Sequence, residues 1–401
     1  MSTFHIWTLG CQMNQADSLK LAAGLQTLGY HAVDDDTEAD LVVINTCSVR
    51  QHAEDRAYSR LGVLKKRRSQ GGEFKLAVMG CMVGPKTDDL RKRFPYVDVW
   101  ARPQEFDGIL QVAGDYRDVS GGELGTLLDA PRGDTAGSFK MAQGTYGLPK
   151  GPTAYVPVIH GCDKFCTYCI VPLRRGREDS RPAADILDEV RFLAEHGVRE
   201  VTLLGQTVEA YGHDLEPDAN GERPDLATLF EGIDRIDGIA RVRFLTSYPK
   251  DMTDRIIDAV ADQPKVCEYF NIPVQSGSDS MLERMRRGYT LAEFEERVAR
   301  IRARMPDAAI VTDVIVGCRG ETEAEFADTV ALLERTQFDI IHVAAYSPRP
   351  GTYAARNMAD DVPAEVKKAR LQVIEKLHAA SSERINQRAL GTTVEVLIEQ
   401  S

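Results

Sequence analysis

The sequence lacks any apolar run that approaches the roughly 18 residues required for a membrane span. Its first residues, MSTFHIWTLG, also lack the basic and long apolar segments of a secretory signal. These two absences predict a cytoplasmic protein with no membrane partner. The composition, 43% hydrophobic and 27% charged over 401 residues, is typical of a globular protein. A chain of this length is expected to form about two or three domains.

Positive charge is also in short supply, because the formal net charge is −12 at pH 7. This balance argues against non-specific binding to nucleic acid. Local basic runs remain candidates for phosphate contacts, although such runs are more often solvated helix ends or loops. The four runs are Lys65–Arg68, Arg174–Arg177, Arg284–Arg287 and Lys367–Arg370.

The densest cysteine motif, HGCDKFCTYCIVP, has no fourth cysteine nearby. Its three cysteines are Cys162, Cys166 and Cys169, with the spacing C-x3-C-x2-C. A structural zinc site needs four ligands, whereas three thiolates on a short loop suit a 4Fe–4S cluster with one open iron. S-adenosylmethionine is the cofactor that uses such an iron for radical chemistry. Another metal, another cluster or a coincidental spacing are the alternatives.

A second set of cysteines is distributed over residues 1–113. Short apolar runs alternate there with amphipathic stretches, which predicts an α/β domain with an open parallel sheet. Each run, at 5–10, 41–46 and 76–80, is followed at once by a cysteine: Cys11, Cys47 and Cys81. Parallel strands end at one edge of a sheet, so we expect these cysteines to meet and hold a second cluster. The alternative is that all three are small core residues.

Two further segments and a short tail follow this domain. Residues 114–151 are rich in glycine and are interpreted as a linker. Residues 152–390 contain six strand–helix units, which predict a partial, open (βα)6 barrel. Capping boxes within this segment pair Thr290 with Glu293 and Thr322 with Glu325. The candidate strands are 155–160, 200–205, 242–247, 269–275, 309–317 and 340–347, and residues 391–401 are interpreted as the start of a β domain.

Barrels of this kind carry their chemistry at the carboxyl ends of the strands, and the cysteine loop follows the first strand. Glycines and polar side chains at or beside the ends of later strands are therefore candidate contacts for a cofactor. Ordinary strand termination explains each of them equally well. The candidates chosen are Gln206, Ser247, Gln275 and Asp313.

Longer motifs run through the chain nearly from end to end. They are TLGCQMNQADS (residues 8–18), INTCSVRQHAE (44–54), MGCM (79–82), HGCDKFCTYCIVPLRRGREDSRP (160–182), IPVQSGSD (272–279), MRRGYT (285–290) and YSPRPGT (346–352). In these motifs the chain resembles the methylthiotransferases of the radical S-adenosylmethionine superfamily. The segments CQMN, NTCSVR and CDKFCTYCIVP are most similar to the MiaB type, which acts on tRNA.

This resemblance implies two 4Fe–4S clusters with different roles. Cys162, Cys166 and Cys169 would hold the cluster that binds and cleaves S-adenosylmethionine. Cys11, Cys47 and Cys81 would hold an auxiliary cluster that carries the sulfur to be transferred. Two S-adenosylmethionine molecules would be used to replace the carbon-2 hydrogen of N6-isopentenyladenosine, next to a tRNA anticodon, by a methylthio group. An aromatic C–H bond has no acidic proton, which is why radical chemistry is needed.

The resemblance also implies partners. They are the tRNA anticodon loop, an electron donor such as flavodoxin or ferredoxin, and a sulfur donor, and the protein is expected to be a monomer. Reaching the modified base requires its removal from the stack of the anticodon loop.

The chain departs from the family pattern at three places. Residues 317–321 read GCRGE where GFPGE is usual, and Thr207 and Glu209 replace two asparagines in LLGQTVEAYG. The third place is residues 391–399, which are expected to form only the first strand of the family's C-terminal RNA-binding domain, the TRAM domain. Cys318 and Cys267 are interpreted as loop and core residues and not as metal ligands.

Two other functions remain open at this point. One is a sister methylthiotransferase that acts on threonylcarbamoyladenosine in tRNA or on an aspartate of a ribosomal protein. The other is a non-catalytic two-cluster iron–sulfur protein that carries electrons or binds RNA. Only an enzyme would release 5′-deoxyadenosine and methionine when it is reduced with S-adenosylmethionine.

Overall fold

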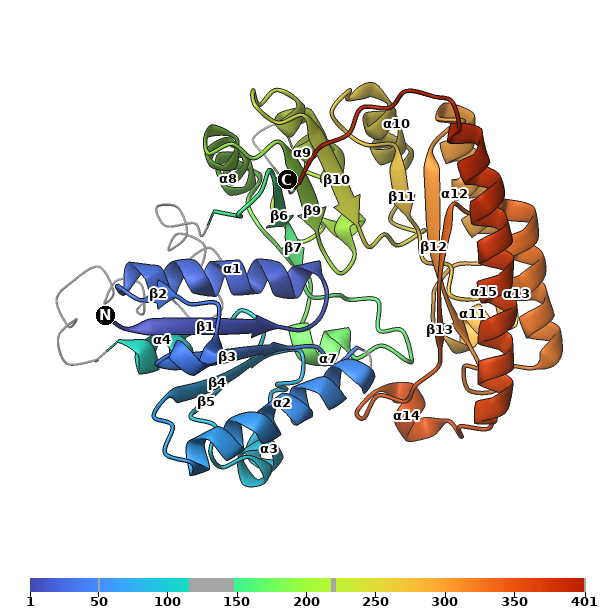
Figure 1. The fold of residues 1–401 in the computed structure, drawn as a ribbon. Coiled ribbons are helices and arrows are strands. Elements are labelled where there is room, and N and C mark those ends of the chain that lie inside the picture. Colours follow the sequence, from blue (N-terminus) through green and yellow to red (C-terminus); the bar gives the residue numbers. More distant parts are fainter. Residues whose placement is uncertain (50, 115–147, 218–220, 400–401) are drawn as a thin grey trace. The chain divides into compact units, whose positions relative to one another are not determined.

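A computed structural model describes residues 1–49, 51–114, 148–217 and 221–399 (Figure 1). The chain divides into two compact units. The N-terminal unit comprises Met1–Lys150 together with Ile170–Arg181, and the barrel unit comprises Gly151–Cys169 together with Pro182–Ser401. Residues 170–181, which the sequence placed within the barrel segment, group with the N-terminal unit. Most of the expected linker at 114–151 lies outside the described residues.

The N-terminal unit is built on a five-stranded parallel sheet with the strand order β2-β1-β3-β4-β5. Its strands are β1 (Thr3–Thr8), β2 (His31–Ala32), β3 (Leu41–Thr46), β4 (Lys75–Gly80) and β5 (Val99–Ala101). The three predicted strands are β1, β3 and β4, which are adjacent in the middle of the sheet. The short β2 and β5, which the sequence did not predict, extend its two edges.

Helices cover both faces of this sheet (Figure 1). Leu41 and Val43 of β3 pack in one apolar cluster with α1 (Gln12–Thr27) and α4 (Asp107–Ala113). Val42 and Ile44 pack in another with α2 (Gln51–Ser69) and α3 (Asp88–Arg93). This explains why β3 is an unbroken apolar run, since a central parallel strand is buried on both faces. The other elements of the unit are η1 (Asp36–Glu38), α7 (Val171–Arg175) and β8 (Asp179–Ser180).

The barrel unit contains the six expected parallel strands. They are β6 (Thr153–Pro157), β9 (Glu200–Leu204), β10 (Arg241–Leu245), β11 (Tyr269–Asn271), β12 (Ala309–Val316) and β13 (Ile340–Ala345). They form two three-stranded sheets, β6-β9-β10 and β11-β12-β13. The Ser247 N–H donates to the Asn271 carbonyl at 3.1 Å, which links the end of β10 to β11. The strands therefore follow one another in chain order as an open barrel, as predicted.

Helices pack around these strands, and several of them begin at a side-chain cap. Both predicted capping boxes, at the starts of α12 (Leu291–Arg304) and α13 (Glu323–Thr336), are present. The long α15 (Ala364–Asn386) packs against β13 and ends the barrel. The remaining strand is β7 (Ile159–His160), and the helices are α8 (Ala183–Glu195), η2 (Val208–Ala210), α9 (Leu226–Asp234), α10 (Asp254–Asp262), α11 (Asp279–Arg284), α12 (Leu291–Arg304), α13 (Glu323–Thr336), α14 (Tyr353–Asn357), α15 (Ala364–Asn386) and η3 (Gln387–Ala389).

The segment after α15 differs from the sequence prediction. Residues 391–399, all of them described, form no strand, so the expected first strand of a C-terminal β domain is not confirmed. None of the described helices combines the length and the apolar character needed to cross a membrane.

Candidate active site

The three N-terminal cysteines follow three neighbouring strands of one sheet. Cys11 occupies the N-cap position of α1, just after β1. Cys47 directly follows β3 and Cys81 directly follows β4. The thiols of Cys11 and Cys47 both act electrostatically on Cys81, so they lie close to it. The structure thus gathers the three cysteines at the carboxyl edge of the sheet.

Two glycines allow the strand ends at this edge to approach closely. Gly10 has φ +133° and Gly80 has φ +95°, conformations that other residues rarely adopt. A Cβ atom on Gly10 would lie 2.8 Å from Asn14 Oδ1, and one on Gly80 would lie 2.4 Å from Asn45 Oδ1. Both positions therefore exclude a side chain, and the backbone forms a tight cradle around the thiols.

Two buried asparagines, which sequence reasoning did not select, fix this cradle. The Asn14 amide donates to Asn45 Oδ1 and to the Thr46 carbonyl, both at 2.8 Å. The Asn45 amide donates to the Asn14 carbonyl at 2.7 Å. Cys11 Sγ donates to Asn14 Oδ1 at 3.4 Å. The signal that marks them is their position three residues after Cys11 and two before Cys47.

A charged side chain from α7 completes the surroundings of this edge. Burial raises the pKa of the Cys81 thiol to about 11, and the nearby Arg175 guanidinium opposes that rise. Arg175 makes a 3.0 Å ion pair with Asp17 of α1. Burial alone would lower the pKa of Arg175, but Asp17 and the thiols hold it above its ordinary value. A metal ion that replaced the Cys81 proton would keep the sulfur as a thiolate.

The second cysteine loop lies in the barrel unit, after β7. Cys162 and Cys166 are buried and Cys169 is partly buried. The Cys169 N–H donates to the Cys166 carbonyl at 3.0 Å, and the Thr167 N–H donates to the Met285 carbonyl at 3.0 Å. Cys162 Sγ lies 3.2 Å from Thr207 Oγ1, so the loop is anchored next to the end of β9.

Arg287, from the motif MRRGYT, fixes a positive charge beside this loop. Its Nη1 donates to Cys166 Sγ at 3.3 Å, and its Nη2 donates to the Pro273 carbonyl at 3.0 Å. The guanidinium also lies over the rings of Tyr248 and Tyr289, at 4.9 and 5.3 Å from their centroids. The buried guanidinium thus places a fixed positive charge and a hydrogen-bond donor against Cys166 Sγ.

Several buried polar atoms beside the cysteine loop are left without a partner. Within the described residues, Gln206 Oε1, Gln275 Oε1 and Glu209 Oε1 accept no hydrogen bond. Ser247 Oγ also makes no hydrogen bond of normal geometry, although it lies near enough to Glu209 to lower the pKa of that carboxyl. All four follow β9, β10 or β11 at the carboxyl edge. Buried polar atoms without partners are costly, so this edge is suited to a polar ligand.

Backbone strain occurs at the same edge. Thr246 (φ +74°) and Gln275 (φ +72°) adopt left-handed conformations that cost a non-glycine residue free energy. Asp313, the fourth predicted contact, lies within β12 rather than at its end. Its Oδ2 accepts a hydrogen bond from the Asn271 amide at 3.2 Å. The structure thus groups Gln206, Ser247 and Gln275 at the edge and places Asp313 deeper in the barrel.

Glu209 gives a test of this arrangement through pH. Burial raises its pKa from 4.5 to about 8, although the nearby Ser247 hydroxyl and a hydrogen bond from the Tyr248 N–H oppose the rise. Between these two values the folded protein binds a proton that the unfolded chain has released, so stability falls as pH rises. We expect the free energy of unfolding to fall by up to about 1.4 kcal/mol per pH unit across this window. Glu209→Gln removes the titrating proton and should abolish that dependence.

Unfolding of the parental protein and of Glu209→Gln at about pH 6 and about pH 8 measures this effect. The free energy of unfolding of the parental protein should be lower at the higher pH, whereas that of Glu209→Gln should not show this fall. Equal pH dependence in the two proteins would contradict a neutral, buried Glu209.

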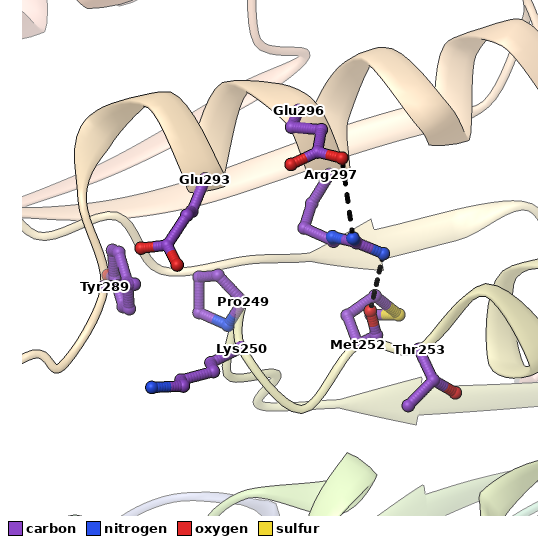
Figure 2. Close-up of a pocket in the computed structure, with 8 residues that line it drawn as sticks. All are labelled: Pro249, Lys250, Met252, Thr253, Tyr289, Glu293, Glu296 and Arg297. Carbon is purple, nitrogen blue, oxygen red and sulfur yellow. Dashed lines mark hydrogen bonds and ion pairs between the residues drawn. The ribbon is translucent and has the colours of Figure 1, made fainter.

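A separate cleft of about 290 Å³ lies beside this edge (Figure 2). It is lined by Pro249, Lys250, Met252, Thr253, Tyr289, Glu293, Glu296 and Arg297. Figure 2 shows Arg297 bridging Glu296 and the Met252 carbonyl, with separations of 3.8 and 3.5 Å. Its side chains carry charges of both signs and include no cysteine, so we assign no cluster or cofactor to it.

Both cysteine sets fit an iron–sulfur cluster by their donors and surroundings. Among the described residues, no three Cys, His, Asp or Glu side chains converge closely enough to hold a single metal ion. Thiolates that bind separate irons of one cluster need not converge on one point. Three thiols in a loop and three at a glycine cradle are the donor sets that such clusters use.

Three of the four basic runs place a basic side chain inside the protein. Arg175 and Arg287 face the two cysteine sites, and Arg370 pairs with Glu321 at 2.7 Å. Lys367 pairs with Asp360 at 2.6 Å. The basic side chains of these runs that remain exposed are Lys65, Lys66, Arg177, Arg286 and Lys368.

The fold and this site define a radical S-adenosylmethionine enzyme. The Radical SAM superfamily matches residues 156–333, and the uncharacterized protein family UPF0004 matches residues 3–102. A radical S-adenosylmethionine methyltransferase from Kitasatospora setae has a similar structure. Its TM-score is 0.62 at 15% identity, over 88% of this chain and 77% of that one.

Curated relatives identify the family within that class. The tRNA-2-methylthio-N(6)-dimethylallyladenosine synthase of Dehalococcoides mccartyi is 42% identical over all of this chain and 88% of its own length. The enzyme of that name from Rhodopirellula baltica is 42% identical over 99% of this chain and 83% of its own length. The chain belongs to this family of radical S-adenosylmethionine methylthiotransferases, and it is an enzyme.

Proposed function

We propose that this enzyme replaces the carbon-2 hydrogen of N6-isopentenyladenosine, next to the anticodon of a tRNA, by a methylthio group. The observation that carries the proposal is the presence of two three-cysteine sites at the carboxyl edges of two separate sheets. The full-length similarity to synthases of that name supports the choice of substrate.

The two sites would hold two 4Fe–4S clusters with separate tasks. Cys162, Cys166 and Cys169 would bind the first, which together with S-adenosylmethionine supplies a radical able to remove hydrogen from carbon. Cys11, Cys47 and Cys81 would bind an auxiliary cluster, with the glycine cradle excluding other groups. Arg287 donates hydrogen bonds to Cys166 Sγ and to the Pro273 carbonyl, and so fixes the loop beside β11.

The unpartnered polar atoms at the barrel edge would orient S-adenosylmethionine. Gln206, Ser247 and Gln275 offer hydrogen-bonding groups where a cofactor with hydroxyl, amino and carboxylate groups needs them. Asp313 would act from deeper in the barrel, where it also accepts from Asn271. The neutral carboxyl of Glu209 can donate a hydrogen bond as well as accept one.

The partners follow from this chemistry. The tRNA anticodon loop would be contacted by exposed cations such as Lys65, Lys66 and Arg286, whose charge suits phosphate groups. An electron donor such as flavodoxin or ferredoxin would reduce the radical cluster, and a sulfur donor would supply the transferred atom. We further propose that the protein works in the cytoplasm, where tRNA is found, and that it is a monomer.

Mass spectrometry of tRNA nucleosides tests the reaction directly. Cells without the protein should contain N6-isopentenyladenosine and no 2-methylthio derivative. Expression of the parental chain should convert most of the unmodified nucleoside, whereas a Cys162→Ala variant expressed to the same level should convert none. A methylthio group found instead on threonylcarbamoyladenosine would reject the proposed substrate, and no change in any nucleoside would reject tRNA.

A further inference from the structure

An ion pair beside the N-terminal cysteines is buried more completely than is usual. Arg175 Nη2 lies 3.0 Å from Asp17 Oδ2, and the two side chains are only 2% and 0% exposed. Taking both charges out of water costs several kcal/mol per ion, which their attraction offsets only when the remaining hydrogen bonds are made. Such a pair therefore needs an explanation beyond stability.

The remaining hydrogen bonds are not all made. Within the described residues, Arg175 Nη1 and Asp17 Oδ1 make no hydrogen bond of normal geometry, although the guanidinium lies near enough to the Cys81 thiol to lower its pKa as a donor. The guanidinium nevertheless acts electrostatically on both Cys81 and Cys11. A fixed cation thus lies against two of the three thiols, and its Nη1 makes no hydrogen bond of normal geometry. This donor is available to a group that arrives with the metal.

We propose that Arg175, held in place by Asp17, is a positioning residue that binds a sulfur anion at the open iron of the auxiliary cluster. The inference rests on the proposed function, because it requires that cluster. Three thiolates give such a cluster a net negative charge, and a bound sulfide or methanethiolate makes it more negative. A buried cation with a free N–H stabilises that charge through a charge-assisted hydrogen bond. Asp17 orients the guanidinium, and its negative charge lowers the net charge of the pair.

The competing explanation is that the pair only fastens α7 to α1. The two explanations predict different changes in the reduction potential of the auxiliary cluster. If the charges act on the cluster, then removing Arg175 and removing Asp17 change the reduction potential in opposite directions. If the pair is only a fastener, each change weakens the unit in the same way and the potential of the remaining clusters does not move.

The test uses the full chain, reconstituted with iron and sulfide, with Cys162, Cys166 and Cys169 all changed to alanine. The signal then comes from the auxiliary cluster alone. Arg175→Gln, Asp17→Asn and the double variant are compared by iron content, by redox titration followed by electron paramagnetic resonance, and by titration with sodium sulfide.

Arg175→Gln should retain about four irons and bind sulfide about tenfold more weakly, the effect of losing one hydrogen bond to a charged group. Its reduced fraction at a fixed potential should fall about tenfold, which corresponds to about 59 mV for one electron. Asp17→Asn should raise that fraction. The double variant should return the potential towards the parental value, while sulfide binding stays weak because the donor is absent.

If Arg175→Gln loses its iron, the double variant, which buries no unpaired charge, decides the question through its weak sulfide binding. Unchanged sulfide affinity in a variant that retains its iron would overturn the proposal. Shifts of the potential in the same direction for both single variants would do so too. A different result, no iron in the parental triple-alanine chain, would instead reject the second cluster itself.

Discussion

Changing Cys162, Cys166 and Cys169 together to alanine should abolish cleavage of S-adenosylmethionine and leave about four of about eight irons per chain. The reason is that only the three thiols of the cysteine loop would hold the cluster that binds the cofactor. The N-terminal cysteines belong to a separate unit with its own sheet and core, so their cluster should survive. Iron analysis and the yield of 5′-deoxyadenosine under anaerobic reduction measure the two effects.

Cys267→Ala is a matched control for this experiment. Cys267 is partly buried in the same unit, where burial raises the pKa of its thiol, and no cysteine of the loop acts on it. The variant should keep about eight irons and full cleavage. If the triple variant still releases 5′-deoxyadenosine, the radical cluster has been assigned to the wrong cysteines.

The fold and the cysteine positions could be predicted because they depend on local patterns and on one topological rule. The apolar runs that became β1, β3 and β4 are long enough to recognise, and parallel strands end at one edge. Strands β2 and β5 are only two and three residues long, which is too short for a periodic signal. Their existence is decided by pairing with the strands already formed.

The residues that surround the cysteines could not be predicted, because their positions depend on contacts between distant parts of the chain. Arg175 and Arg287 are members of basic runs that resemble solvated segments, and only the fold shows that they face thiols. Residues 170–181 belong to the N-terminal unit although they directly follow the barrel cysteines in the sequence, and no local pattern indicates this. Asn14 and Asn45 adjoin the cysteine motifs, so proximity to Cys11 and Cys47 was the signal that could have revealed them.

Glu209 illustrates a difference between a motif and its environment. The sequence marks it as a replacement for asparagine, a change from an amide to a carboxylate. The structure buries it and raises its pKa to about 8, so that near neutral pH it is largely an uncharged carboxylic acid. A protonated carboxyl and an amide can both donate one hydrogen bond and accept others. The change from asparagine to Glu209 therefore alters the hydrogen bonding at this position less than a change from an amide to an ionised carboxylate would.

Changing Cys11, Cys47 or Cys81 singly to alanine should separate cofactor cleavage from sulfur transfer. Each change removes one of three thiolates, so the auxiliary cluster should be weakened or lost while the radical cluster remains. The S-adenosylmethionine site is then intact, and 5′-deoxyadenosine should still form in a slow, uncoupled reaction. No methylthio group should reach tRNA, because no sulfur is held where the substrate radical can meet it. The two products are measured together in one reaction by mass spectrometry.

The three variants are expected to differ in how much iron and activity an added thiol restores. Cys47 and Cys81 are buried, whereas Cys11 is exposed at the N-cap of α1, so a small exogenous thiol has a route only to the position of Cys11. We therefore expect added thiol to restore some iron and some methylthiolation to Cys11→Ala and little to Cys47→Ala or Cys81→Ala. Cys267→Ala should behave as the parental enzyme throughout. Normal methylthiolation in all three N-terminal variants would remove the sulfur-carrier role and leave these residues as core cysteines.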